Sequence, residues 1–216
     1  MSSTDTRPAT TAQGTGIADP APLGLAAFAL TTFLLSVINA SWAKNTTGGD
    51  WWGYAIAYGG LAQLLAGMWE FRNRNVFGAT AFSTYGAFWI GIALWLHFIA
   101  PTASHPIQLN RDLGWILLAF AIFNAYMLFW STQLNMAVFM VFLTLQLTEI
   151  FLFIGNFATS TAALPPFTNY NNPWIMVGGY IGVITALVAW YTSAAGVING
   201  IKGRQVLPVG KPLMNM

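Results

Sequence analysis

Residues 114–123 read GWILLAFAIF, a run of ten residues without a polar side chain. Strands of a membrane β-barrel alternate apolar and polar residues, so an unbroken apolar run favours a helix. A helix needs roughly 20 mostly apolar residues to cross about 30 Å of hydrocarbon. The stretch around this run covers 113–131, and five further stretches cover 23–43, 51–71, 79–100, 135–156 and 174–200. The sequence therefore predicts an all-α membrane protein with six transmembrane helices.

The composition of the whole chain agrees with this prediction. Of its 216 residues, 56% are hydrophobic and only 6% are charged, whereas soluble domains carry about 25% charged residues. The chain has no cysteine and two histidines, which excludes a disulfide framework, an iron–sulfur site or a thiolate zinc site. The sequence has no metal or nucleophile motif typical of an enzyme, and no basic run typical of nucleic-acid binding. We therefore expect no enzyme activity, no metal or other cofactor, and no nucleic-acid partner.

The basic residues predict how the chain lies across the membrane. With six spans, both termini lie on one side. That side holds Arg7, Arg72, Arg74, Lys202, Arg204 and Lys211, and the other holds Lys44 and Arg111. Because cytoplasmic loops are enriched in Lys and Arg, we expect cytoplasmic termini and a multi-pass protein of the plasma membrane. The predicted divisions are a disordered cytoplasmic tail over 1–16, one transmembrane domain over 17–204 and a cytoplasmic tail over 205–216.

Polar side chains recur along the first predicted helix. Phe28, Thr32, Ser36 and Asn39 are spaced by four, four and three residues, so they share one helix face. In a lipid-embedded helix, a polar face points into the bundle or into a wet cavity, where it can line a pathway. The hydroxyls can instead bond back to carbonyls of their own helix. The spacing leaves both interpretations open.

The second predicted helix combines small and polar residues on one face, with Gly60, Gln63, Gly67 and Glu70 at spacings of three and four. Glycine lets two membrane helices approach closely, and a glutamine can hydrogen-bond across their contact, so Gln63 is a candidate to line a pathway. Glu70 lies at the end of the helix, close to two arginines. For it, an interfacial ion pair or a loop anchor is favoured over a transport role.

The last predicted helix carries a stripe of small residues. The stripe consists of Gly178, Gly182, Ala186, Ala189, Ser193, Gly196 and Gly200. Stripes of this kind allow close backbone contact between membrane helices. They predict tight packing, either within one protomer or between protomers.

Glu149 is the one ionisable residue deep inside a predicted span. A charged carboxylate at the centre of a membrane helix is unfavourable by roughly 2.5 to 3.5 kcal/mol on insertion scales, so this side chain must be protonated, hydrated or paired. It shares a face with Leu145 and Asn156. Two interpretations stand: Glu149 lines a pathway and exchanges a proton, or it is a neutral acid bonded across a helix or subunit contact.

Three ordered motifs relate the chain to a known family. Residues 19–25 read DPAPLGL, that is Asp19, Pro20, Ala21, Pro22, Leu23, Gly24 and Leu25, in which Asp19 and Pro20 also suit the start of a helix. The second motif runs from Gly59 to Trp89, and the third runs from Gly178 to Pro208. With Asp19 in place of the family asparagine, the chain resembles the acetate transporter family, the succinate–acetate permease group also called Gpr1/Fun34/YaaH, over residues 17–212.

The resemblance implies a six-helix protomer, a homo-hexamer and a domain that moves acetate, succinate, formate or similar small carboxylates. Members of the family are described as proton-coupled symporters or as channels. By motif position, the constriction of the family falls on Phe28, Tyr85 and Leu145. We expect the Tyr85 hydroxyl to hydrogen-bond the substrate there and the other two residues to supply an apolar wall.

The residues themselves suit weak binding of an anion. No Lys or Arg lies inside a predicted span, so a carboxylate would be met by hydroxyls, amides and helix N-termini, which also allow rapid release. Two departures from the family bear on this, namely the extra charge of Asp19 at the predicted cytoplasmic mouth and Glu149 inside a span. The alternative is a structural membrane protein that assembles through its glycine-rich faces and carries no flux.

Overall fold

The computed structural model describes residues 16–44, 46–47, 49–159 and 172–214. The predicted N-terminal tail over 1–16 therefore lies, except for its last residue, outside the described residues. Within the described part the chain is helical and contains no strand, which confirms the all-α prediction. Among the described residues, five helices are long and apolar enough to cross a membrane. They are α1 (Ala21–Asn39), α4 (Val76–Leu94) with its continuation to Thr102, α5 (Pro106–Ser131), α6 (Met136–Ala158) and α7 (Pro173–Lys202).

The remaining predicted span, 51–71, which is the second along the chain, is helical but is not a continuous α-helix. It is divided into α2 (Trp52–Ile56), a π-helical segment η1 (Ala57–Ala62) and α3 (Gln63–Arg72). A second π-helical segment, η2 (Trp95–Ile99), and a short 3-10 turn, η3 (Ala100–Thr102), continue α4. Hydrogen bonds from residue i to i+5 widen a helix locally, and such segments are frequent at functional sites.

Asparagine and aspartate side chains cap the N-termini of α1, α4 and α6, and their positions can be recognised in the sequence. Asn75 Oδ1 accepts a hydrogen bond from Gly78 N at the start of α4, and Asn135 Oδ1 accepts one from Val138 N at the start of α6, both at 3.0 Å. Each bond satisfies a backbone N–H that has no partner within the helix. At the start of α1, Asp19 Oδ1 accepts from Ala21 N at 3.0 Å, so the carboxylate caps the helix one residue before its assigned N-cap, Pro20.

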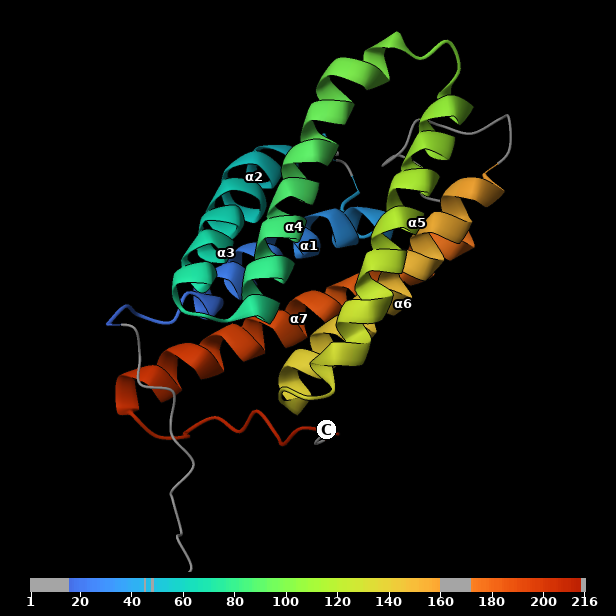
Figure 1. The fold of residues 1–216 in the computed structure, drawn as a ribbon. Helices are drawn as coiled ribbons and strands as arrows, with labels where there is room; N and C mark the ends of the chain where they lie inside the picture. The colour runs from blue at the N-terminus through green and yellow to red at the C-terminus, as the bar shows by residue number, and fades with distance from the viewer. Residues whose placement is uncertain (1–15, 45, 48, 160–171, 215–216) are drawn as a thin grey trace, which may run out of the picture.

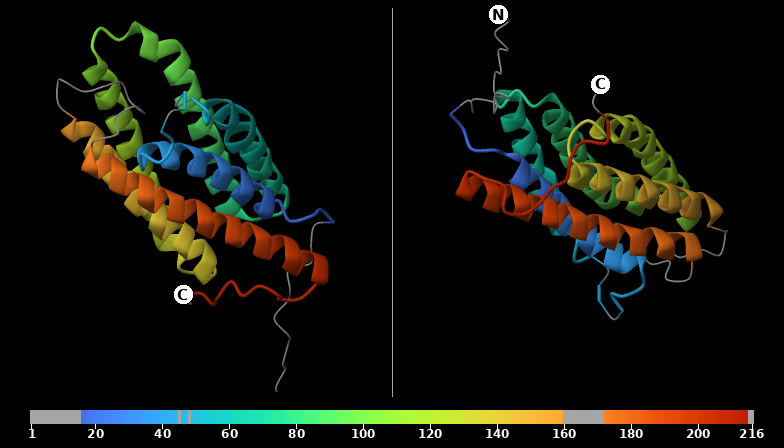
Figure 2. Two further views of the ribbon diagram at one scale, coloured as in Figure 1. Left: turned by 180° about the vertical axis from the view of Figure 1, so that it is seen from behind. Right: turned by 90° about the horizontal axis from the view of Figure 1, so that it is seen from below.

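The helices form two groups that meet at α1. Figures 1 and 2 show α7 lying along α1 and α6, and α5 running beside α6. On the other side, α3 packs against α4, and η1 packs against both α1 and α4. The buried core lies between these groups, where α1, α4, α5 and α6 turn their side chains toward one another.

Small residues set the closest helix contacts. A Cβ added at Gly178 would lie 2.8 Å from Leu152 Cδ2 of α6, and one added at Gly196 would lie 2.8 Å from Pro22 Cγ of α1. Gly182 faces Ser36 of α1. All three contacts are within one protomer. Among the other small residues singled out from the sequence, Gly60 faces Ile90 and Gly67 faces Ser83, both of α4, and Ala186, Ala189 and Ser193 are buried. A Cβ added at Gly200 would meet nothing within 4 Å, so the predicted tight packing does not extend to this end of the stripe.

The sequence predicts a tail after residue 204, but this segment is fixed to the helices. We call residues 203–214 the C-terminal strap. Asn199 of α7 holds its first part, since its Oδ1 accepts from Val206 N at 2.6 Å and Leu207 N at 3.0 Å, and its Nδ2 donates to Leu207 O at 3.0 Å. The left-handed backbone of Gly203, with φ of 60°, turns the chain back from α7.

The rest of the strap reaches the other helices. Tyr191 Oη donates to Pro208 O at 2.6 Å, and Ala137 N at the start of α6 donates to Val209 O at 2.9 Å. Leu213 N donates to Thr132 O, next to the end of α5, at 2.8 Å. The strap therefore joins one end of α5, α6 and α7.

Replacing Asn199 with alanine is expected to detach the strap, because three hydrogen bonds to residues 206 and 207 are lost together. At about 1 kcal/mol for each bond, or about 3 kcal/mol for the three, the segment should open more often and be cut by trypsin up to about 100-fold faster. The measurement is the rate of cleavage after Lys202 and Arg204. Asn199→Asp is the matched control, since its carboxylate still accepts from both N–H groups. Equal cleavage rates in Asn199→Ala and the wild type would contradict the assignment.

Candidate functional site

A cavity of about 50 Å³ lies between α1, α4, α5 and α6. This volume can hold more than one water molecule. Seven residues singled out from the sequence line it, and the structure thus brings together three separate stretches of the chain. These residues are Phe28, Thr32, Ser36 and Asn39 of α1, Tyr85 of α4, and Leu145 and Glu149 of α6. The polar face predicted for α1 is buried and points into the bundle.

A second cavity, of about 30 Å³, adjoins the first. The two share lining residues, among them Asn39, Phe88 and Leu152. Asn156, predicted to line a pathway, lines this second cavity. Gln63, also predicted as a pathway residue, is buried in α3 but lines neither of the two cavities. The structure therefore brings all the predicted pathway residues except Gln63 to one continuous interior region.

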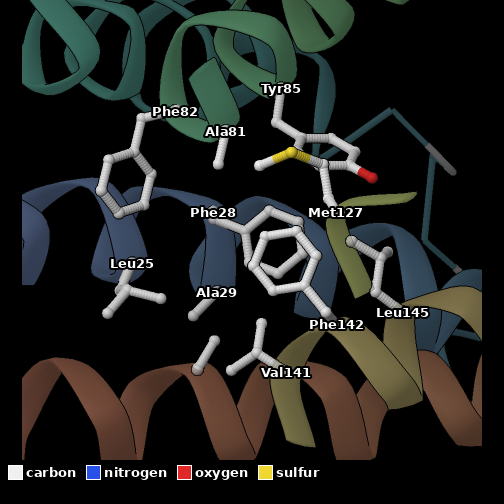
Figure 3. Packing of buried hydrophobic residues seen from close by; sticks show 11 residues of the cluster. Leu25, Phe28, Ala29, Ala81, Phe82, Tyr85, Met127, Val141, Phe142 and Leu145 are labelled. Atoms are coloured by element: carbon white, nitrogen blue, oxygen red, sulfur yellow. The ribbon is translucent and has the colours of Figure 1, made fainter. Parts of the chain in front are cut away.

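Phe28, Tyr85 and Leu145, the three residues of the predicted constriction, all line the first cavity. The rings of Phe28 and Tyr85 lie 5.9 Å apart, centre to centre, in an edge-to-face arrangement. Leu145 belongs to the same buried cluster, and Figure 3 shows the three side chains converging from α1, α4 and α6. Phe120 and Phe123 of α5 pack against the other side of the Tyr85 ring. Contacts on both sides fix the position of this ring.

The Tyr85 hydroxyl belongs to a polar network that the sequence did not reveal. It lies 3.0 Å from Asn124 Oδ1 of α5 and 3.2 Å from Glu149 Oε1 of α6. Asn124 Nδ2 donates to Phe142 O and to Gln146 Oε1, each at 3.0 Å. An asparagine and a glutamine inside apolar spans are themselves a signal for interhelical hydrogen bonding, and that signal could have indicated both residues.

Three side chains of the first cavity carry a buried polar atom without a hydrogen-bond partner among the described residues. These atoms are Thr32 Oγ1, Trp89 Nε1 and Glu149 Oε2. Burying a polar atom without a partner is unfavourable by about 1 to 3 kcal/mol, so such atoms are uncommon and call for an explanation. Their concentration in one cavity provides unused hydrogen-bonding capacity for a polar ligand. Trp89 was not among the residues singled out from the sequence.

Neutral groups supply all the polarity of these cavities apart from Glu149. No Lys, Arg or His lines either of them in the described part of the chain. Nor do the described residues contain a group of three or more His, Cys, Asp or Glu able to hold a metal ion. An anion in this region would be bound by dipoles rather than by an opposite charge, which favours weak and reversible binding.

Glu70 lies apart from this region and is completely buried. Its Oε2 accepts from Asn73 Nδ2 at 3.1 Å, and a Cβ added at Gly78 would lie 2.7 Å from its Oε1. The favoured prediction named an ion pair with the nearby arginines or a loop anchor. Of these two, the described structure shows the loop anchor, since the carboxyl group bonds Asn73 in the turn between α3 and α4.

The DPAPLGL motif positions the start of α1 rather than lining the cavities. Gly24 lies against the ring of Phe82 in α4, and Pro22 O accepts a hydrogen bond from Ser193 Oγ of α7 at 2.6 Å. Leu25 is buried in the core, while Leu23 is 47% exposed. The motif therefore holds α1 in contact with α4 and α7, and Asp19 caps the helix.

A bundle of long apolar helices around a neutral, polar-lined interior defines a polytopic α-helical membrane protein. The family model described as the GPR1/FUN34/yaaH family matches residues 3–210. The chain belongs to this family, which confirms the resemblance seen in its three motifs.

Individual relatives agree with the family assignment. Acetate permease A of Emericella nidulans is 40% identical over 200 residues, which cover 89% of this chain and 65% of the permease. Accumulation of dyads protein 2 of Saccharomyces cerevisiae is 39% identical and is covered over 61% of its length. The chain thus spans less than two thirds of the length of these relatives. The succinate-acetate/proton symporter SatP of Escherichia coli is 34% identical, with coverage of 91% of this chain and 97% of the symporter.

One solved structure shares the whole fold. The structure of the bacterial acetate channel SatP superposes with a TM-score of 0.77 at 33% identity, and the match covers 90% of this chain and 99% of the channel.

Proposed function

We propose that this chain transports acetate and related small carboxylates, such as succinate or formate, across the plasma membrane. The observation that carries the proposal is the cavity lined by Phe28, Tyr85 and Leu145, whose polar lining is supplied by neutral groups apart from Glu149. The printed names of an acetate permease, a symporter and an acetate channel among its relatives support the same substrate class. The protein acts as a transporter and not as an enzyme, and it needs no cofactor.

In the proposed path, the substrate sheds water in steps. Hydroxyls and amides of Thr32, Ser36 and Asn39 replace part of the hydration shell of the carboxylate on one face of α1. The Trp89 N–H is a further donor, without a partner among the described residues. At the constriction, Phe28 and Leu145 admit a methyl-sized apolar group but disfavour a longer chain.

The proposed topology has six spans. Residues 52–72 form an uninterrupted run of helix through α2, η1 and α3, and at 1.5 Å per residue such a run reaches about 30 Å, enough to cross a membrane. With this sixth span, both termini lie in the cytoplasm and residues 17–204 form the transport domain. Six such protomers form a homo-hexamer in the lipid bilayer.

Uptake of labelled acetate into liposomes that contain the purified protein tests the function. We expect uptake well above that of protein-free liposomes, which report the passive diffusion of acetic acid. Dependence of the protein-mediated part on an inward proton gradient would indicate symport, whereas equilibration that follows the acetate gradient alone would indicate a channel. Absence of protein-dependent flux of acetate, succinate and formate would contradict the proposal and favour a structural role.

A further inference from the structure

The hydrogen bonds around Tyr85 have only one consistent order of donors. Asn124 Nδ2 is fixed as the donor side of its amide, because it faces a backbone carbonyl, Phe142 O, which can only accept. Its other partner, Gln146 Oε1, is fixed in turn, because Gln146 Nε2 donates to Ala121 O at 3.2 Å. Asn124 Oδ1 is therefore an acceptor, and it faces the Tyr85 hydroxyl at 3.0 Å.

The Tyr85 hydroxyl has one proton, and this order of donors determines which atom receives it. Tyr85 must donate to Asn124 Oδ1, since the two oxygen atoms would otherwise face each other at 3.0 Å without a proton between them. The Tyr85 oxygen can then only accept from Glu149 Oε1, which lies 3.2 Å away. A carboxylate has no proton to donate, whereas a carboxylic acid has one. This order of donors therefore favours the protonated form of Glu149.

The surroundings of Glu149 favour the same form. Its side chain is 4% exposed, and its Oε2 has no partner in the described residues. Among the described residues, Tyr85 is the one titratable group that the packed helices bring to it. α1 presents Thr32 and Ser36, α5 presents Asn124 and apolar side chains, and the neighbouring hydroxyl Thr148 pairs with Thr185 of α7. The described lining of the cavity contains no cation that would stabilise a carboxylate.

We propose that Glu149 is a proton-bearing gate residue of this transporter: the proton must be on Glu149 for a carboxylate to pass the constriction. The inference rests on the proposed transport function and adds a residue that controls it. An ionised Glu149 would place a negative charge beside Tyr85 and Leu145, in a region without cations, and would repel the anionic substrate. Asn124 is a positioning residue, since it takes the Tyr85 proton and so leaves the Tyr85 oxygen to accept from the acid.

The first test compares protein-mediated acetate flux between about pH 5.5 and about pH 9, with equal pH on both sides. Over most of this range a simple carboxylic acid with a pKa of about 4 to 5 is ionised, so the substrate itself changes little. In the wild type, flux should fall by about tenfold or more as Glu149 loses its proton. Glu149→Gln keeps a donor toward Tyr85 and cannot ionise, so the ratio of its flux at high and low pH should be close to 1. A wild-type pH profile in this variant would overturn the proposal.

A matched control separates this gate from buried acids in general. Glu70 is also buried, but it lies outside the cavities. Glu70→Gln should therefore keep the wild-type pH profile. A flat profile in Glu70→Gln together with an unchanged one in Glu149→Gln would move the gate to Glu70 and overturn the proposal.

The positioning role of Asn124 predicts the direction in which the pH of the fall in flux moves when Asn124 is replaced. In Asn124→Leu, which is similar in volume, the Tyr85 proton is free to be donated to Glu149, and a donor stabilises the ionised form. The fall in flux should then occur at lower pH than in the wild type. A fall at the same or higher pH, in protein that elutes as the wild type does in size-exclusion chromatography, would overturn the assignment of donors.

Infrared spectroscopy tests whether Glu149 is protonated and does not depend on a transport measurement. The wild type in lipid at neutral pH should show the C=O stretching band of a protonated carboxylic acid, and Glu149→Gln should lose it. An unchanged band in this variant would overturn the protonated form. A band that is lost as expected, in a protein that carries no flux of any small carboxylate, would overturn the proposed function while leaving the proton on Glu149 established.

Discussion

Under the proposed transport function, replacing Tyr85 with alanine is expected to widen the range of carboxylates that pass. The ring of Tyr85 lies at the proposed constriction and packs against Phe28, Phe120 and Phe123. Without it, the gap between α1 and α6 can admit a longer alkyl chain. Since one methylene is worth about 10- to 200-fold in discrimination by an apolar pocket, the rate for butyrate relative to acetate should rise by about tenfold or more.

Tyr85→Phe is the matched control for this change, because it keeps the ring and removes only the hydroxyl. Its discrimination against butyrate should stay close to that of the wild type, while its flux of acetate should change. The measurement is competition of unlabelled carboxylates of increasing length with labelled acetate in liposomes. Unchanged transport and selectivity in both variants would remove Tyr85 from the constriction.

Replacing Gly179 with alanine is expected to destabilise the protein strongly. A Cβ at this position would lie 2.6 Å from Asn39 C and 2.8 Å from Ala40 Cα, which are backbone atoms of α1 and its end and cannot move aside as a side chain can. Overpacking of this kind is unfavourable by about 1 to 3 kcal/mol. At about 2 to 4 °C per kcal/mol for a chain of this length, the midpoint of thermal unfolding should fall by several degrees.

Gly200→Ala provides the opposite expectation in the same helix. A Cβ there would meet nothing within 4 Å, and alanine is favoured over glycine inside a helix by up to about 1 kcal/mol. Its midpoint should equal or exceed that of the wild type. Thermal unfolding in detergent, followed by tryptophan fluorescence, measures both. An equal or higher midpoint for Gly179→Ala would show that α1 and α7 are packed less closely than the structure indicates.

The long apolar runs predicted the helices because the membrane requires apolar surface along a whole span. The boundaries were less predictable where polar residues still form helix. The stretch before residue 113 contains polar residues and two prolines, yet α5 begins at Pro106, seven residues earlier. Gln108 Oε1 accepts from Ser104 N at 2.9 Å, and this local capping stabilises a helical turn that hydropathy does not reveal.

The π-helical segments could not be predicted for a different reason. The spacing of apolar residues cannot distinguish a hydrogen bond to residue i+4 from one to residue i+5, because the lipid-facing surface stays apolar in both cases. In η1, the choice depends on neighbours in space. A Cβ added at Gly59 would lie 2.7 Å from Thr31 Cβ, which belongs to α1.

The candidate site was predictable where a motif or a helix face fixed the residues. Phe28, Thr32 and Ser36 share a face of α1, and the structure brings this face to the cavity. The partners of Glu149 were not predictable, since its contact with Tyr85 joins residues 64 positions apart. Gln63 was predicted from the same helix-face spacing as the α1 residues, but it is buried in α3 away from the cavities.

The bonds of Tyr85 have a mechanical consequence for the contact between the two helix groups. α5, α6 and α7 are tied together by the C-terminal strap, and α7 is in close contact with α1. α2, η1, α3 and α4 form the other group, and α1 contacts it as well, since Thr31 Oγ1 donates to Tyr54 O at 3.4 Å. In the described part of the chain, the hydrogen bonds from α4 to α5 and α6 all come from Tyr85, and the remaining contacts are rings such as Phe88 and Phe120, which can slide. Any separation of α4 from α5 and α6 would therefore break the bonds around Glu149, so the contact between these helices and the position of its proton depend on each other.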